Sequence, residues 1–258
     1  MLDLAGRGVI VTGTRRLGAV VVRRLALEGL RPAIVYRNSR GPAEELAASV
    51  RDLTDRVALV QADLTIEADV IRAVETARAE LGDLSFSVNL AADYPRVAFE
   101  ELDLPAWDRG MEVAKVAYLM GLHVGRALAQ NSGRTRGHMV FFGDWAAEET
   151  PYHDYLPYLS AKAAIHFMVR AFALELAPQG ILVNAISPGP TGGKPENVSE
   201  AEWAEALSSA PLHRESSEED MAELIATLLK LETVTGENIR VDSGRHIVGT
   251  VPKDYRAG

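Results

Sequence analysis

Tyr158 and Lys162 are the residues whose types and spacing point most directly to proton transfer. Residues four positions apart are neighbours on one face of a helix. The pKa of a phenol is ordinarily too high for efficient proton exchange near neutral pH, and an adjacent ammonium lowers it by favouring the phenolate. Tyr152 and Tyr155 are close by, but only Tyr158 has a lysine four residues later. Such a pair is also common on helix surfaces, so its catalytic interpretation depends on the surrounding elements.

A glycine-rich turn near the N-terminus predicts a phosphate-binding site. Residues 12–18 follow a short apolar run and precede a helical pattern. Bare backbone at such a turn can approach a pyrophosphate, and the N-terminus of the next helix attracts its negative charge. A nucleotide P-loop is excluded, because Ala19 and Val20 stand where that motif requires lysine and then serine or threonine. The dinucleotide contacts expected here are Gly13, Arg15, Arg16, Leu17 and Gly18.

The charge cluster after the second apolar run bears on the choice of cofactor. About 20 residues beyond such a turn, an NAD enzyme usually presents an acidic side chain to the ribose 2′-hydroxyl, whereas a basic one suits a 2′-phosphate. The segment Tyr36 to Arg40 contains no acid. A guanidinium matches phosphate oxygens, and a serine hydroxyl can donate a further hydrogen bond. We therefore expect NADPH as the cofactor, with contacts from Arg37, Asn38 and Ser39.

The elements that must position these groups follow an alternating pattern of short apolar runs and longer helical stretches. This pattern is typical of βαβ units, a parallel sheet and helices on both faces. Helical stretches are expected at 17–28, 42–53, 67–81, 105–130 and 155–177, and several of them end at glycine or proline. Strands are expected at 9–11, 33–36, 57–60, 86–89, 139–142 and 181–184, with a weaker one at 239–241.

The domain organisation expected is a single unit spanning residues 1–258, because no Pro-, Gly- or Ser-rich linker divides the chain. The irregular stretch 189–210 follows the sixth expected strand. In such folds this place is taken by a loop and short helix that cover the substrate, and Gly192-Gly193 could act as its hinge.

Composition excludes several classes of partner. The net charge of −9 repels nucleic-acid phosphate and anionic lipid. The chain has no cysteine, and His123, His153 and His166 do not show metal-ligand spacing, so no metal site is expected. We find neither a signal-peptide pattern at the start nor a run of roughly 18 apolar residues. These features predict a cytoplasmic protein that acts on a small molecule.

With these residues in place, the chain resembles the short-chain dehydrogenase/reductase family over nearly its whole length. Five motifs occur in the family's order: 12–18, 62–64, 89–92, 158–162 and 187–189. The resemblance implies a Rossmann-like doubly wound parallel α/β sheet of about seven strands, and a homotetramer or homodimer. It implies that Lys162 holds the nicotinamide ribose while Tyr158 protonates the substrate as hydride arrives. Further cofactor contacts implied are Asp63, Leu64, Asn89, Ala91, Tyr158, Pro188, Gly189 and Thr191.

Several departures from the family pattern narrow the interpretation. The glycine-rich turn is one residue short and has Arg16 in place of its middle glycine. Ala114 stands where the family's catalytic asparagine is expected. The family's serine, about 13 residues before the tyrosine, is replaced by the segment Gly143-Asp144-Trp145; Trp145 has the strict spacing, and Asp144 fits with one inserted residue.

Three features together resemble the pteridine reductase branch of the family: an arginine in the glycine-rich turn, the segment with arginine and serine after the second apolar run, and aspartate in place of the serine. In that branch an aspartate and the tyrosine deliver protons to ring nitrogens, and an aromatic residue five positions after the first asparagine stacks on the flat ring. Counting from Asn89 gives Tyr94. The resemblance therefore implies Asp144 as a third catalytic residue and Tyr94, Asp144, Trp145 and Tyr158 as substrate contacts.

Two functions follow as expectations. The first is an NADPH-dependent reductase of a pteridine or a related C=N or C=O substrate. The alternative is a regulatory or sensor protein that binds NADP(H) in the same fold but is catalytically impaired, because the asparagine and serine are missing and the turn is short.

Overall fold

A seven-stranded parallel sheet forms the centre of the computed structural model, which describes residues 1–13, 15–91, 93–194 and 198–248. All seven expected strands are confirmed, and they lie in the order β3-β2-β1-β4-β5-β6-β7. This is the Rossmann-like doubly wound arrangement. The strands are β1 Gly8–Thr12, β2 Arg31–Tyr36, β3 Ala58–Gln61, β4 Phe86–Asn89, β5 Gly137–Phe142, β6 Ile181–Pro188 and β7 Asn238–Val241.

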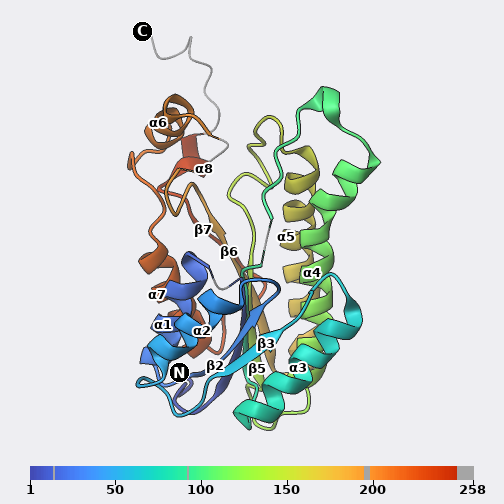
Figure 1. The fold of residues 1–258 in the computed structure, drawn as a ribbon, viewed down its shortest axis with the longest axis vertical. Helices are drawn as coiled ribbons and strands as arrows, with labels where there is room; N and C mark the ends of the chain where they lie inside the picture. Colours follow the sequence, from blue (N-terminus) through green and yellow to red (C-terminus); the bar gives the residue numbers. More distant parts are fainter. Residues whose placement is uncertain (14, 92, 195–197, 249–258) are drawn as a thin grey trace.

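Helices cover both faces of this sheet (Figure 1). One layer contains α1 Leu17–Leu27, α2 Arg40–Val50 and α7 Glu218–Lys230. The other contains α3 Glu67–Leu81, α4 Leu104–Leu128 and α5 Leu156–Leu176. The five expected helices are therefore confirmed, with bounds that shift by no more than a few residues.

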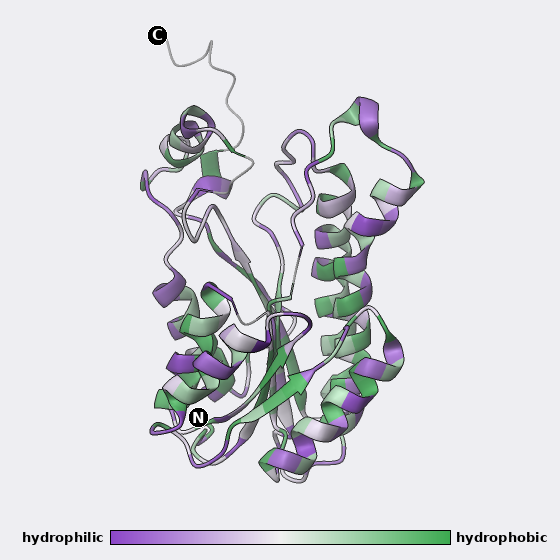
Figure 2. Ribbon diagram, viewed as in Figure 1, coloured by the Kyte–Doolittle hydropathy of each residue, from purple (hydrophilic) through white to green (hydrophobic). Residues whose placement is uncertain are grey.

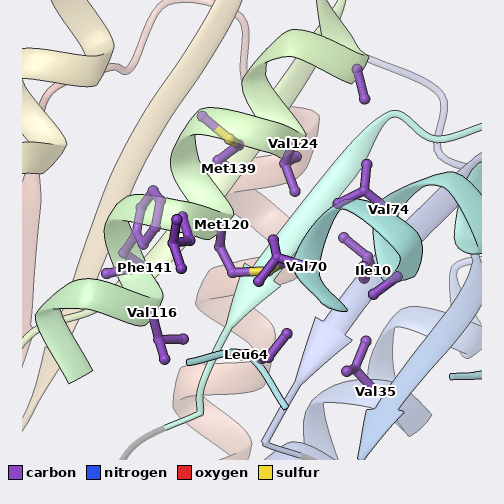
Figure 3. Packing of buried hydrophobic residues seen from close by; sticks show 14 of the residues in the cluster. Ile10, Val35, Leu64, Val70, Val74, Val116, Met120, Val124, Met139 and Phe141 are labelled. Carbon is purple, nitrogen blue, oxygen red and sulfur yellow. The ribbon is translucent and has the colours of Figure 1, made fainter. Parts of the chain in front are cut away.

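The two faces of the sheet bury separate hydrophobic clusters, which explains why the strands read as continuous apolar runs. Val9 and Val11 of β1 point into the cluster under α1 and α7, whereas Ile10 between them points into the cluster under α3 and α4. Figure 3 shows Ile10 in this second cluster together with Val74 of α3 and Met120 of α4. Hydrophobic strands accordingly lie at the centre of the molecule, with many hydrophilic residues on the outer helices (Figure 2).

The helix α7 is not among the sequence predictions, although its signals are present in the chain. The Ser217 hydroxyl accepts a hydrogen bond from the backbone N–H of Asp220 at 3.0 Å and so caps the helix. Its buried residues, which include Met221, Ile225 and Leu229, face α1. This spacing of apolar residues is that of an amphipathic helix.

Two short helices, α6 Glu200–Ser208 and α8 Arg245–Val248, lie beyond the carboxyl ends of the strands (Figure 1). A capping box formed by Ser199 and Glu202 starts α6. The expected substrate loop 189–210 thus contains a short helix, while its residues 195–197 lie outside the described part of the chain. Gly192 and Gly193 both have positive φ, at 71° and 81°, as a hinge of glycines permits.

The centre of the sheet is the topological switch point between β1 and β4, where doubly wound folds bind their ligands. The hydroxyl of Thr12 donates to the side-chain oxygen of Asn89 at 2.6 Å, and it accepts from the backbone N–H of Ala91 at 3.2 Å. These bonds tie together the carboxyl ends of the two strands. They also place Asn89 in a structural contact at the base of the crevice.

No helix within the described residues has both the length and the apolar character needed to cross a membrane.

The buried His138 on β5 predicts a loss of stability in acid. Burial lowers the pKa of His138 to about 3, so the folded state excludes a proton that the unfolded chain accepts. The free energy of unfolding should therefore fall by up to about 1.4 kcal/mol per pH unit from this residue as the pH drops from the ordinary histidine pKa toward 3. Urea unfolding at several pH values measures the slope.

The matched variants for this measurement are His138→Gln and, as a control, His153→Gln at an exposed position. Glutamine at 138 keeps an acceptor for the amide of Asn184, which contacts the imidazole at 2.7 Å. His138→Gln should flatten the acid slope, whereas His153→Gln should not. Equal slopes in the two variants would contradict this account.

Candidate active site

A cavity of about 510 Å³ opens at the carboxyl ends of β1 to β4. It is lined by seven of the residues expected to contact the dinucleotide, which come from the first turn and from the ends of β2, β3 and β4: Gly13, Arg15, Arg37, Ser39, Asp63, Leu64 and Ala91. An adjoining groove includes Asn38 together with Arg37 and Asp63. The topology therefore brings these predicted dinucleotide contacts together at one place.

Close backbone packing explains the glycines of the first turn. Gly13 has φ 73°, and a Cβ atom there would come within 2.7 Å of the backbone N of Ala91. A Cβ atom on Gly18 would collide with the carbonyl oxygen of Gly13. Arg16, which replaces the family's middle glycine, adopts φ 47° and so takes a backbone conformation that glycine normally supplies.

The donors around this cavity fit the anionic groups of a dinucleotide. α1 begins without a capping side chain and without an acidic residue in its first turn, so its N-terminal amides are suited to phosphate. Arg15 and Ser39 line the same cavity. The guanidinium of Arg37 is 3.8 Å from the carboxylate of Asp63 and its side chain is largely exposed, which leaves donors for a ligand.

Sequence reasoning missed the wall of the cavity that α4 contributes. Arg109, Glu112, Val113 and Val116 line it from this helix. Their spacing of three and four residues marks one helix face, but the sequence alone does not say that this face meets the ends of β1 and β4. Ala114, at the position of the family's asparagine, is buried in the hydrophobic cluster instead.

Asp144 and Tyr158 face each other in a buried cluster beyond β5. The Tyr158 hydroxyl donates to Oδ2 of Asp144 at 3.2 Å, and each residue is only 7% exposed. The other carboxyl oxygen accepts from the backbone N–H of Ala146 at 2.9 Å. Of the two residues that the spacing leaves open, Asp144 therefore contacts the phenol, whereas Trp145 stacks against Tyr152 with ring centroids 6.3 Å apart.

Tyr152 is a further member of this cluster that sequence reasoning set aside. Its hydroxyl donates to the same Asp144 oxygen at 3.2 Å, and it accepts from the Tyr94 hydroxyl at 3.1 Å. It carries no signal in the sequence, because no lysine or other partner stands at a helical spacing from it. Only the folded loop between β5 and α5 brings it to Asp144.

Lys162 lies beside Tyr158 as the i, i+4 spacing predicts, but its ammonium does not contact the phenol oxygen. It donates to the backbone carbonyl of Phe142 at 2.8 Å and lies 5.5 Å from the centre of the Tyr158 ring. The side chain is 3% exposed, and burial lowers its pKa to about 8. It is therefore still mainly charged at neutral pH.

The electrostatics of the cluster differ from the expectation that Lys162 lowers the pKa of Tyr158. Burial and the nearby Asp144 raise the Tyr158 pKa well above its ordinary value. Burial also raises the pKa of Asp144, and this effect outweighs the backbone bond from Ala146 and the charge of Lys162. Both groups are thus biased toward their protonated forms, which suits proton donation.

Tyr94 covers the cluster from the loop after β4. Its ring stacks on Tyr155 with centroids 4.3 Å apart and meets the ring of Tyr158 edge-on at 4.9 Å. The side chain is 39% exposed, which makes it the outermost of these rings. On the other side, the guanidinium of Arg245 lies 5.1 Å from the centre of the Trp145 ring and bonds to Ser209 and Ala206 at the end of α6.

A buried histidine fixes the backbone that carries Asp144. The Asp144 N–H donates to Nε2 of His166 at 3.2 Å, so this nitrogen must be the acceptor and Nδ1 carries the proton. Nδ1 lies 3.0 Å from the carboxylate of Glu148. Burial lowers the pKa of His166, which keeps the ring neutral. Gly143 is required here because a Cβ atom would collide with His166 and Ser187.

The remaining predicted contacts lie at the start of α1 and at or just after the end of β6. Leu17 opens α1. The N–H of Gly189, which follows Pro188 at the end of β6, donates to the carbonyl of Val241 at 3.0 Å, and the Thr191 hydroxyl donates to the carbonyl of Ser216 at 2.7 Å. Among the described residues, no three histidine, aspartate or glutamate side chains gather as a metal site would require.

Comparisons with known proteins bear on the family of this chain. A family model described as enoyl-(acyl carrier protein) reductase matches residues 11–246. The chain is 28% identical over 249 residues to 3beta-hydroxysteroid dehydrogenase 1 of Eggerthella lenta, and the match covers 94% of each chain. It is 31% identical over 251 residues to cis-4-hydroxycyclohexanecarboxylate dehydrogenase of Sinomonas cyclohexanicum, covering 93% of this chain and 96% of the relative.

A solved structure supports the same assignment. FolM alternative dihydrofolate reductase 1 from Brucella canis, complexed with NADP, superposes with a TM-score of 0.84 at 28% identity, covering 97% of this chain and 98% of that chain. The ordered motifs, the seven-stranded parallel sheet and these matches show that the chain is an oxidoreductase of the short-chain dehydrogenase/reductase family.

Proposed function

We propose that this chain is an NADPH-dependent reductase of a pteridine or a related C=N or C=O substrate, with Tyr158 as the proton donor. The observation that carries the proposal is the buried hydrogen bond between Tyr158 and Asp144 beside the Lys162 ammonium. Both acids are biased toward their protonated forms by burial. Such groups are prepared to give a proton to an atom that gains negative charge.

Tyr158, Lys162 and Asp144 have different roles in the proposed reduction. A bound nicotinamide dinucleotide supplies hydride to the substrate carbon. Tyr158 gives its proton to the adjacent oxygen or nitrogen, and the Lys162 charge stabilises the phenolate that remains. Asp144 hydrogen-bonds to Tyr158 and, in its protonated form, can donate to a heterocyclic nitrogen. The burial of all three excludes bulk water and strengthens these interactions.

The preference for NADPH rests on the charge at the end of β2. Arg37 and Ser39 line the cavity, Asn38 lies in the adjoining groove, and Arg15 approaches from the first turn. A basic, forked donor set suits a 2′-phosphate. The complex of the Brucella canis FolM protein with NADP supports this choice.

A flat heterocycle is the substrate that these groups fit best. A carboxyl group can pair with an amino-pyrimidine edge, and Tyr94 offers an aromatic face beside Tyr158. The similarity to a protein named as a dihydrofolate reductase supports this class. The two dehydrogenases named above support a ketone or alcohol as the competing class.

The proton-donor assignment predicts the behaviour of two variants. Tyr158→Phe keeps the ring but removes the proton, so NADPH oxidation should fall by about 100-fold to 10,000-fold. Asp144→Asn keeps the size of the side chain and should lower the rate with dihydrobiopterin more than the rate with a simple ketone. Spectrophotometric assays with dihydrobiopterin and a ketone panel measure both effects.

The control for these assays is Tyr118→Phe, which removes an exposed hydroxyl on α4. NADPH binding, followed by fluorescence, should survive in all three variants. Binding by the wild-type chain without turnover of any panel substrate would instead favour a catalytically impaired sensor. Undiminished turnover in Tyr158→Phe would exclude Tyr158 as the donor.

The cofactor preference predicts a second pair of variants. Arg37→Ala should raise KM for NADPH about ten- to a hundredfold, because it removes charged hydrogen bonds to the 2′-phosphate, and should leave KM for NADH nearly unchanged. Arg40→Ala is the matched control, since this arginine pairs with Glu44 at 2.8 Å and does not line the cavity. Equal effects of Arg37→Ala on the two cofactors would contradict a 2′-phosphate contact.

The lowered pKa of Lys162 predicts the pH dependence of reduction. The ammonium is charged below a pKa of about 8 and loses its charge above it. With a neutral ketone as substrate, kcat/KM for reduction should therefore decline as the pH rises through this value. A profile that stays level through this range would show that the Lys162 charge is not required.

A further inference from the structure

We propose that Tyr152 and Tyr94 relay protons from solvent to Asp144, which returns a proton to Tyr158 after each turnover. The inference rests on the proposed reductase function and adds to it a route for the proton supply. It is carried by a continuous series of hydrogen bonds through four side chains, whose outer end reaches the surface and whose inner end is buried.

The need for such a route follows from burial. Tyr158 and Lys162 are 7% and 3% exposed, so solvent has little direct access to the donor. On α4, Ala114 stands where the family's asparagine is expected, and its methyl group packs in the hydrophobic cluster. A methyl group can neither accept nor donate a proton.

The tyrosine chain offers the connection that Ala114 lacks. The Tyr94 hydroxyl donates to the Tyr152 oxygen at 3.1 Å, and the Tyr152 hydroxyl donates to Oδ2 of Asp144 at 3.2 Å. Tyr158 meets the same oxygen at 3.2 Å. Tyr94 is 39% exposed and is therefore the point of contact with solvent. A phenol hydroxyl can both donate and accept a hydrogen bond, so each link can pass a proton inward.

The protons balance over one turnover. Tyr158 loses its proton to the substrate oxygen or nitrogen as hydride reaches the neighbouring carbon. Protonated Asp144 then gives its proton to the Tyr158 phenolate and becomes a carboxylate. The carboxylate takes a proton from Tyr152, Tyr152 takes one from Tyr94, and Tyr94 takes one from bulk solvent. The net result is one solvent proton and one hydride added to the substrate.

Burial supports Asp144 as the residue of the relay that passes the proton to Tyr158. Its pKa is raised because the carboxyl group is desolvated, so the protonated state is within reach between turnovers. The pKa of Tyr152 is also raised well above its ordinary value by burial. Tyr152 therefore gives up its proton only as it receives another from Tyr94, and it does not remain ionised.

The first test follows the Asp144 proton itself and needs neither cofactor nor substrate. In mildly acidic solution the infrared band of the protonated carboxyl group is identified by its loss in Asp144→Asn. After mixing with D2O, this band shifts as the proton exchanges. Tyr152→Phe keeps the ring but interrupts the relay, and should slow the exchange about tenfold or more, as should Tyr94→Phe at the outer link. Tyr118→Phe should exchange at the wild-type rate.

The second test separates proton supply from hydride transfer. In Tyr152→Phe the first turnover after mixing with NADPH and dihydrobiopterin, or with the best ketone of the panel, should keep the wild-type rate because Tyr158 already holds its proton. Later turnovers should be about tenfold slower, and imidazole buffer should restore them in proportion to its concentration. A structural defect would slow the first turnover as well and would not respond to buffer.

The outcomes distinguish this inference from the proposed function. Exchange at the wild-type rate in both Tyr152→Phe and Tyr94→Phe would overturn the relay, whatever the substrate is. Absence of turnover by the wild-type chain would overturn the proposed reductase but leave the exchange measurement valid. Turnover by the wild-type chain would support the proposed reductase. Slowed exchange in the variants, together with a normal first turnover and rescue by buffer in Tyr152→Phe, would support the relay as well.

Discussion

The hydrogen bond between a buried carboxyl group and a buried phenol is the interaction on which the rest of the site depends. Asp144 follows the end of β5 and Tyr158 lies in the first turn of α5, and the Tyr158 hydroxyl reaches Oδ2 of Asp144 at 3.2 Å. Both residues are only 7% exposed, so their ionisation costs more than it does in solution. This single constraint biases the pair toward its protonated form, as the proposed proton donation requires.

Neighbouring residues hold Asp144 and Lys162 in position although their polar groups are buried. His166 accepts the Asp144 backbone N–H, and its other nitrogen is fixed by Glu148. Lys162 is held by the carbonyl at the end of β5, which keeps its charge next to the ring of Tyr158 rather than on the phenol oxygen. The cation is thus placed to stabilise a phenolate once one forms. It does not create one beforehand.

The sequence predicted most of the fold because its signals are local. Buried strands such as β4 read as short apolar runs, and Gly82 stops α3 in the left-handed conformation expected of a C-terminal glycine. The helix α7 was missed, although Ser217 caps it. The choice between Asp144 and Trp145 stayed open because residue spacing does not reveal a one-residue insertion in a loop. Tyr152 was set aside, since no lysine follows it at a helical spacing and its partner Asp144 comes close only through the fold of the loop.

A crystal structure of the complex with NADPH tests the central claim most directly. The account predicts that the dinucleotide extends from Arg37 past Gly13, with its nicotinamide ring facing the Tyr158 hydroxyl and the Asp144 carboxyl group. Tyr94 should then lie over the substrate position next to that ring. A nicotinamide ring bound away from Tyr158, with the Tyr158–Asp144 bond still covered by protein, would contradict the account.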